Sequence, residues 1–161
     1  MLHVSGLVPT RFLTITSHLI LTITVLISRD DNILACLPPD YSQTDFYRKD
    51  TELAAGLGVA IGLMAIELVS VLPTHSFSYS HRDNSPPTLQ VGFLSGITMF
   101  SPVQSLLSIG AHSAATVAMG YFCLDTWDCD LYWWIFGLCS CLPAVVELSI
   151  MVGVLGLKKP V

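Results

Sequence analysis

The sequence predicts an all-α membrane protein with four transmembrane helices, and two observations lead to this fold class. Of the 161 residues, 52% are hydrophobic and only 12% are charged, with a mean hydropathy of +0.65. This composition is too apolar for an ordinary soluble domain. Several stretches with at most one charged residue are also long enough to cross a bilayer, which takes about 20 helical residues. Four such stretches with their connections fill the chain and leave no room for a separate catalytic domain.

The first helix is expected at about residues 12–28, a run without charge that Arg11 and Arg29 bracket. Its length is just sufficient to span the hydrocarbon core. A cleaved signal peptide is the alternative, because a basic residue followed by an apolar stretch is typical of one. No small-x-small cleavage site precedes Arg29, so we favour an uncleaved membrane anchor.

The other three helices are expected at about residues 53–72, 103–124 and 131–155. Residues 29–52 contain two consecutive prolines and six acidic residues and are expected to form a loop outside the membrane. Residues 73–92, rich in Ser, Pro and His, are expected to form a second loop. A short acidic loop at 125–130 completes the single four-span domain.

Charge placement predicts the orientation. Nine of the twelve acidic residues fall in the loops 29–52 and 125–130, together with Arg29, Arg48 and Lys49. The opposite side carries Arg11, Arg82, Lys158 and Lys159. We therefore expect this second side, and both termini, to be cytoplasmic. An aromatic anchor is then expected at the outer membrane interface, formed by Trp127, Tyr132, Trp133 and Trp134.

Four polar residues lie inside the predicted helices: His18, Glu67, His112 and Glu147. A carboxylate within the bilayer costs a few kcal/mol and needs a partner. Glu67 and His18 each lie about two turns from the cytoplasmic boundary, and so, more loosely, do Glu147 and His112, so paired hydrogen bonds between them are feasible. Such groups either relay protons or ions in a small transporter or hydrogen-bond neighbouring helices. We favour helix packing, because the sequence shows no wider polar path through the membrane.

The two halves of the chain resemble each other. Residues 65–68 (Ala-Ile-Glu-Leu) late in the second helix are similar to residues 145–148 (Val-Val-Glu-Leu) late in the fourth. Two related helical hairpins would make this a parallel repeat. Chance similarity between apolar helices explains the likeness equally well.

Small residues predict where helices approach closely. Gly58 and Gly62 form a GxxxG pattern on the second helix. Gly110, Ala114 and Ala118 repeat at a spacing of four on the third. We expect both patterns to support packing within the chain.

Cys36 and Cys129 lie in the two predicted outer loops, and a disulfide between them is an open possibility that sequence cannot decide. No CxxC motif or Cys/His cluster with ligand spacing occurs, so no metal site is expected. HExxH, GxSxG, Walker A and GxGxxG motifs are absent, as is a basic surface for nucleic acid. We therefore expect no enzyme activity, cofactor, small-molecule substrate or nucleic-acid partner, and a chain surrounded by membrane lipids.

Segments spread over nearly the whole chain resemble one family of membrane proteins. They are residues 4–9 (VSGLVP), 28–30 (SRD), 35–38 (ACLP), 92–96 (GFLSG), 104–106 (QSL), 108–112 (SIGAH), 142–145 (LPAV) and 156–159 (GLKK). These segments are similar to the vertebrate transmembrane protein 107 family. The resemblance implies a four-span protein of the ciliary membrane at the transition zone, within the Meckel syndrome module. It offers no catalytic residues to carry over.

The same resemblance implies a role and a set of partners. The role is that of a scaffold that localises partner proteins, restricts ciliary membrane composition and supports cilium assembly and Hedgehog signalling. The implied partners are tectonic proteins, B9-domain proteins and other small membrane components of the transition zone.

The chain departs from the family pattern at one place. In the family, the segment like residues 67–70 runs almost directly into the one like residues 92–96. Here 21 residues, Val71 to Val91, intervene. Such an addition is typical of alternative splicing or of a retained in-frame piece of intron. Its Pro, Ser and His content is expected to replace helix by loop, and this bears on whether the chain assembles normally.

Overall fold

The computed structural model describes residues 6–71 and 102–157, and in these residues the regular structure is helical. Three long helices are α1 (Leu7–Ser28), α3 (Gln43–Val71) and α5 (Pro102–Leu124), and a short α2 (Asp30–Ala35) follows α1. A fourth, composite helix joins η2 (Cys129–Leu131), α6 (Tyr132–Ile135), η3 (Phe136–Cys141) and α7 (Leu142–Leu157). Four helices are long and apolar enough to cross a membrane, which confirms the predicted fold class.

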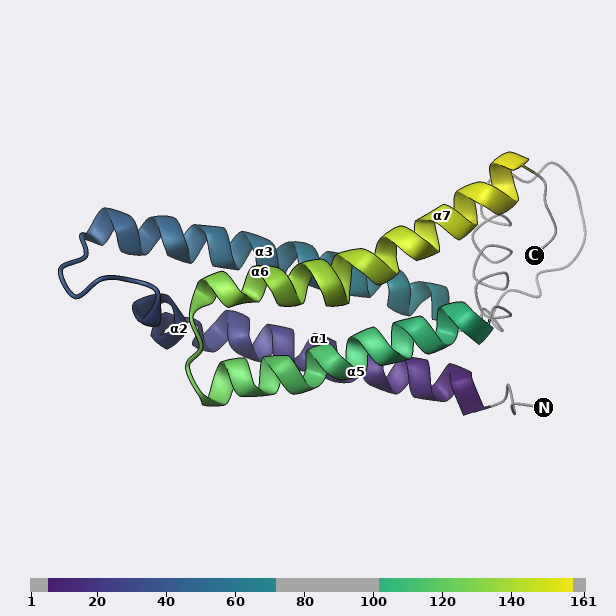
Figure 1. Cartoon of the computed structure of the whole chain (residues 1–161), viewed down its shortest axis with the longest axis horizontal. Coiled ribbons are helices and arrows are strands. Elements are labelled where there is room, and N and C mark those ends of the chain that lie inside the picture. The colour runs from purple at the N-terminus through teal and green to yellow at the C-terminus, as the bar shows by residue number, and fades with distance from the viewer. Residues whose placement is uncertain (1–5, 72–101, 158–161) are drawn as a thin grey trace, which may run out of the picture.

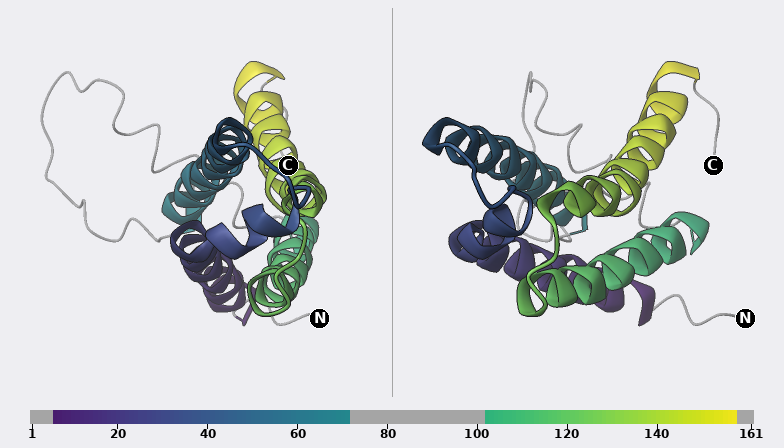
Figure 2. Two further views of the ribbon diagram at one scale, coloured as in Figure 1. Left: turned by 90° about the vertical axis from the view of Figure 1, so that its left-hand side faces the viewer. Right: turned by 60° about the vertical axis from the view of Figure 1, so that its left-hand side comes forward.

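The four spans run alternately up and down, so the start of α1 and the end of α7 lie at one end of the bundle (Figure 1). Seen along the axis, the helices occupy four corners, with α1 beside α3 and α5 and the composite helix opposite α1 (Figure 2). The predicted loop 73–92 and the lysines at 158 and 159 lie outside the described residues.

Two helices begin earlier than predicted. α1 begins at Leu7 rather than near residue 12, so Arg11 lies inside it. α3 begins at Gln43 because Ser42 and Asp45 form a reciprocal cap. The Ser42 hydroxyl accepts from the Asp45 N–H at 3.2 Å, and the Asp45 carboxylate accepts from the Ser42 N–H at 3.3 Å. The expected outer loop 29–52 is therefore largely helical, with a connection left at 36–42.

The fourth helix is not continuous, as the prediction of one helix over 131–155 assumed. The π-helical η3 lies immediately before α7, whose second residue is Pro143. Proline has no N–H to bond the carbonyl four residues before it, and a wide turn accommodates that loss. Beyond this point α7 diverges from α3 and α5 (Figures 1 and 2).

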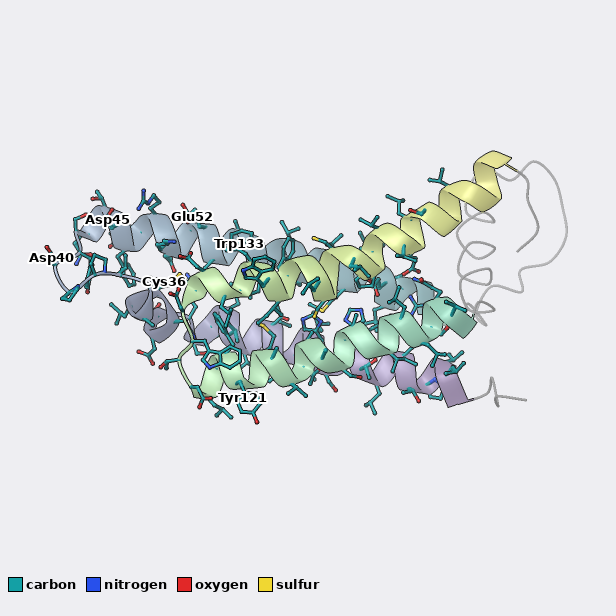
Figure 3. The ribbon with its side chains drawn as sticks, in the orientation of Figure 1. Cys36, Asp40, Asp45, Glu52, Tyr121 and Trp133 are labelled. Atoms are coloured by element: carbon teal, nitrogen blue, oxygen red, sulfur yellow. A yellow bond between two sulfur atoms is a disulfide. The ribbon has the colours of Figure 1, made fainter. Side chains whose placement is uncertain are left out.

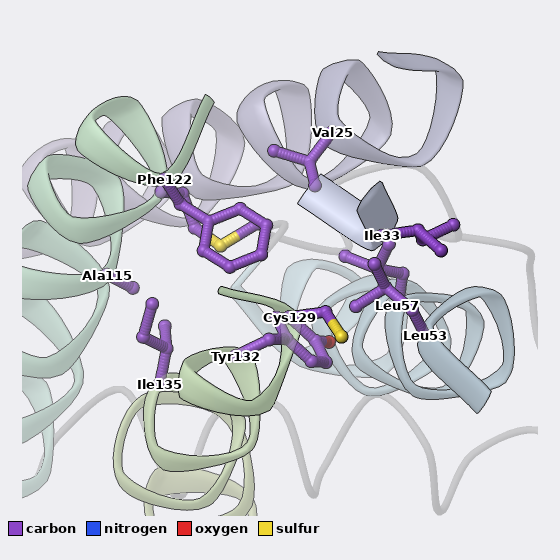
Figure 4. Packing of buried hydrophobic residues seen from close by; sticks show 10 residues of the cluster. Val25, Ile33, Leu53, Leu57, Ala115, Phe122, Cys129, Tyr132 and Ile135 are labelled. Atoms are coloured by element: carbon purple, nitrogen blue, oxygen red, sulfur yellow. The ribbon is translucent and has the colours of Figure 1, made fainter. Parts of the chain in front are cut away.

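Apolar side chains fill the half of the bundle nearest α2. The cluster draws on every span (Figure 4) and contains Val25, Ile33, Leu53, Leu57, Ala115, Met119, Phe122, Cys129, Tyr132 and Ile135. A smaller group, Ile15, Ala60 and Met64, lies next to it towards the other end. The buried residues of α1 recur at positions 11, 15, 18, 22 and 25, the alternating spacing of four and three that places side chains on one seam.

The close helix approach lies at a glycine that the small-residue patterns did not include. Gly58, Gly62 and Gly110 are exposed, and a Cβ added at any of them meets nothing within 4 Å. Ala114 is exposed and Ala118 half-buried. At Gly56, by contrast, a Cβ would lie 2.9 Å from Tyr132 Cε1 and 3.2 Å from Trp133 Cη2. The expectation of packing at Gly58 and Gly62 is therefore wrong within the described chain, because these residues face away from the buried seam of α3.

Candidate functional site

A cluster of five ionisable side chains is buried in the half of the bundle that holds the start of α1. It comprises Arg11 and His18 from α1, Glu67 from α3, His112 from α5 and Glu147 from α7. Each of the five residues is at most 5% exposed, although all of them are polar or charged. Since charged groups inside a membrane bundle are costly, their contacts with one another decide what the cluster can do.

Arg11 lies at the centre of the charged contacts. Its Nη2 donates to Glu147 Oε2 at 2.9 Å and lies 4.0 Å from Glu67 Oε2. Its Nε donates to the Ser108 hydroxyl at 3.1 Å. One guanidinium therefore connects α1 with α5, with α7 on the opposite corner and, more distantly, with α3.

The two histidines extend the cluster as a chain. His112 Nε2 lies 2.9 Å from Glu67 Oε2, and His112 Nδ1 lies 3.0 Å from His18 Nδ1. Each contact requires one proton between its two atoms, so the protonation states of Glu67, His112 and His18 depend on one another.

The structure pairs these residues differently from the pairing of His18 with Glu67 and His112 with Glu147 that similar depth made feasible. Glu67 bonds His112, and Glu147 bonds Arg11. Both contacts run along the diagonals of the bundle, from α3 to α5 and from α7 to α1. The depth of a residue in the membrane does not indicate which helix lies opposite it. Arg11 was assigned to the membrane boundary, but it lies seven residues before His18 and hence on the same buried seam, a spacing that could have revealed it.

Two polar side chains, one next to this cluster and one within it, have atoms without a hydrogen-bond partner among the described residues. Both amide atoms of Gln104, which is 2% exposed, lack a hydrogen bond among the described residues. Glu147 Oε1 is likewise unpaired in this part of the chain. Gln104 is one turn before Ser108 on the buried face of α5, so the polar region continues towards the start of that helix.

The opposite end of the bundle is held by the two connections. The structure joins Cys36, after α2, to Cys129, at the start of η2, in a disulfide with Cα atoms 5.8 Å apart. Asn32 of α2 is buried, and its Nδ2 donates to the carbonyls of Phe122 and Trp127 at 2.8 and 2.9 Å. These contacts cap the end of α5 and fix α2 against it.

Acidic groups gather around the disulfide. Asp40, Asp45 and Glu52 lie at the same end of the molecule as Cys36 (Figure 3). Possible ligand atoms of Cys36, Asp128, Cys129 and Asp130 lie within 4.8 Å of one another. The disulfide removes both thiolates as metal ligands, and Lys49 pairs with Asp130 at 2.6 Å. This arrangement does not favour a metal centre.

Arg29 anchors the junction between α1 and α2. Its Nε donates to Asp50 at 2.6 Å, and its Nη1 donates to the Leu26 carbonyl at 2.6 Å. The hydrogen bond to Asp50 raises the pKa of Arg29 above its ordinary value, so this side chain stays cationic. A cation at the C-terminal end of α1 is also favoured by the helix dipole.

The expected aromatic anchor is only partly at the surface. Trp133 and Trp134 are exposed, and Trp127 stacks on the exposed Tyr121 with ring centroids 6.0 Å apart. Figure 3 shows Tyr121 and Trp133 in the half of the bundle near Cys36. Tyr132 instead belongs to the apolar core, where it contacts Phe122.

Comparison with known proteins gives the family. The family model described as "TMEM107: Transmembrane protein" matches residues 7–83 and 88–151. The chain belongs to the transmembrane protein 107 family. Transmembrane protein 107 of Xenopus laevis is 45% identical over 156 residues, covering 97% of this chain and 96% of the relative. The human protein is 45% identical over 157 residues, with 98% and 96% coverage. The zebrafish (Danio rerio) protein is 40% identical over 146 residues, with 91% and 92% coverage.

The family match bears on the additional segment. The break between its two ranges, at residues 84–87, falls within Val71 to Val91, while most of that segment lies inside the matched ranges. No solved structure matches the chain. Membership in the transmembrane protein 107 family and the four apolar helices together show a multi-pass membrane protein.

Proposed function

We propose that this chain is a non-enzymatic scaffold in the ciliary membrane at the transition zone. In this role it localises partner proteins, restricts ciliary membrane composition and supports cilium assembly and Hedgehog signalling. Membership in the transmembrane protein 107 family supports the proposal, since the sequence resemblance to that family implies this location and role.

The observation that carries the scaffold role is how the buried polar groups are used. Arg11, Glu67, His112 and Glu147 bond to groups on other helices. The other half of the bundle is filled by the apolar cluster around Phe122. Side chains thus hold the helices to one another, as expected of a protein that offers a fixed surface to neighbours.

The proposed partners are tectonic proteins, B9-domain proteins and other small membrane components of the transition zone. Both termini are proposed to be cytoplasmic, which places the disulfide on the outer side, where oxidising conditions preserve it. The acidic connections then face outward, and the helix faces exposed in the bundle are available to lipid and to membrane partners.

Proximity labelling in ciliated cells tests this proposal. A biotin ligase at either terminus should label tectonic and B9-domain proteins more strongly than the same ligase on an unrelated four-span protein of equal abundance. Equal labelling by the two would refute the scaffold role. Tags at both termini should be reached by antibody only after selective permeabilisation of the plasma membrane, and access to either tag in intact cells would refute the orientation.

A small proton- or ion-coupled transporter or channel is the second candidate, favoured by the continuous contacts of His18, His112 and Glu67. Replacing both glutamates by Gln should abolish pH-dependent flux in reconstituted vesicles if the chain is a transporter. A scaffold should instead show no flux above empty vesicles before or after the change. The apolar packing around Phe122 in the opposite half favours the scaffold.

A further inference from the structure

The buried cluster carries more negative than positive formal charge. Arg11 is positive and Glu67 and Glu147 are each negative, so with neutral imidazoles the cluster has one uncompensated negative charge. Among the described residues, the buried Arg, Glu and His side chains are these three together with His18 and His112. They face one another from every long helix: Arg11 and His18 on α1, Glu67 on α3, His112 on α5 and Glu147 on α7.

An uncompensated charge in this position is expensive. Moving an isolated carboxylate out of water into a medium of low dielectric constant is strongly unfavourable even after the protein relaxes. Buried groups usually avoid this cost by binding a proton and becoming neutral. The cluster reaches neutrality by gaining one proton.

The contacts of His112 accommodate such a proton without moving a heavy atom. In the deprotonated state, His18 Nδ1–H donates to His112 Nδ1, and His112 Nε2–H donates to the Glu67 carboxylate. With one proton added, the Glu67 O–H donates to His112 Nε2, His112 Nδ1–H donates to His18 Nδ1, and His18 carries its proton on Nε2. Both states keep the observed contacts of 2.9 and 3.0 Å, because each neutral imidazole has one donor and one acceptor nitrogen.

The position of Arg11 agrees with a neutral Glu67. The guanidinium lies 2.9 Å from Glu147 Oε2 but 4.0 Å from Glu67 Oε2. An ionised Glu67 would compete for it, whereas a protonated Glu67 leaves Arg11 to pair with Glu147. We propose that Glu67, His112 and His18 together form a binding site for one proton, and that this proton keeps α7 attached through Glu147.

The consequence for α7 follows from its position in the bundle. Beyond η3 this helix diverges from α3 and α5, and Glu147 connects it to α1 on the opposite corner. Loss of the proton leaves Arg11 between two carboxylates. The competition weakens the pairing of Arg11 with Glu147, and α7 loosens.

Equilibrium unfolding of the full chain in mixed detergent micelles tests the proton site. Between about pH 7 and 8 the unfolded chain has ionised carboxylates, mostly neutral imidazoles and mostly protonated thiols. The folded chain then holds one proton more, so its folding equilibrium constant should fall about tenfold per pH unit as pH rises. Glu67→Gln, which is permanently neutral and keeps a donor towards His112, should show a flat profile. The control Asn32→Ala, at the other end of the bundle, should be less stable but keep the wild-type slope.

The infrared spectrum of the folded protein within this pH range gives a second readout that does not depend on stability. A protonated carboxyl C=O band should be present in the wild type and absent in both Glu67→Gln and Glu147→Gln, because removing either carboxylate leaves the other one balanced by Arg11. His112→Asn removes the acceptor of the Glu67 O–H and should shift the frequency of the band. The proposal is overturned if the wild-type profile is flat, if Glu67→Gln keeps the slope, if the wild type lacks the band, or if His112→Asn leaves its frequency unchanged. If Glu67→Gln does not fold, the wild-type slope, the wild-type band and its shift in His112→Asn decide: the lack of any one of them overturns the proposal.

Discussion

Gly56 is the position where an added methyl group should most clearly disturb the bundle. A Cβ there would lie 2.9 Å from Tyr132 Cε1, and real Cβ atoms essentially never approach that closely. Tyr132 is 2% exposed and its ring packs against Phe122, Trp133 and Phe136, so it has little room to move. Forcing extra volume into a packed site typically costs about 1–3 kcal/mol.

Gly58 and Gly62 on the same helix provide matched controls, because a Cβ at either meets nothing within 4 Å. Replacing glycine by alanine inside a helix is worth roughly 0.5–1 kcal/mol in the absence of a clash. Gly56→Ala should therefore be about 1–3 kcal/mol less stable than Gly58→Ala or Gly62→Ala when all three are unfolded by denaturing detergent in micelles. Equal stability of the three variants would refute the close approach of α3 and α6.

Three further predictions concern the end of the bundle that carries the disulfide. Asn32→Ala leaves the carbonyls of Phe122 and Trp127 unpaired and should cost about 1–3 kcal/mol in the same unfolding assay, against an Asp31→Ala control on the exposed face of α2. Cys36→Ser should lower the free energy of unfolding by up to about 4.7 kcal/mol, the limit for a cross-link that closes roughly 100 residues. A reducing agent should then have no further effect on this variant. An equal response to the reductant in Cys36→Ser and in the wild type would contradict the pairing. Thr126 has φ 47°, which is unfavourable for a β-branched residue, so Thr126→Gly should raise stability by about 1 kcal/mol, and a loss would contradict that backbone conformation.

The number of spans could be predicted from sequence because hydrophobic length reports directly on the bilayer. The residues at which the helices begin and end could not be predicted. A charged residue marks the end of an apolar run, but the backbone hydrogen bonding of the helix continues past it. α3 extends to Gln43 through a cap formed by Ser42 and Asp45, both inside a segment read as a polar loop. The interruption at η3 depends on Pro143. This proline is visible in the sequence, but the prediction of one continuous helix over 131–155 did not take it into account.

The buried polar residues were predicted correctly as members of the helices, whereas their partners were not. Helix periodicity identifies which residues share a face, but the corner that each face meets is a property of the assembled bundle. Arg11 shows the consequence most clearly. As a charged residue flanking an apolar run it suggests the membrane boundary, yet its long side chain reaches across the bundle to Glu147.

The same reasoning explains why α7 needs a charged residue at all. Its described exposed side chains include Leu142, Val145, Leu148 and Val152, so an apolar pattern does not distinguish an inner face from a lipid-facing one. Between apolar helices in lipid, hydrophobicity supplies little preference for any rotation about the helix axis. Burying Glu147 against Arg11 supplies that preference, because every other rotation would leave the Glu147 carboxylate without its cationic partner. The ion pair thus specifies the orientation of the helix that packs least closely, while the apolar cluster around Phe122 supplies most of the packing in the other half.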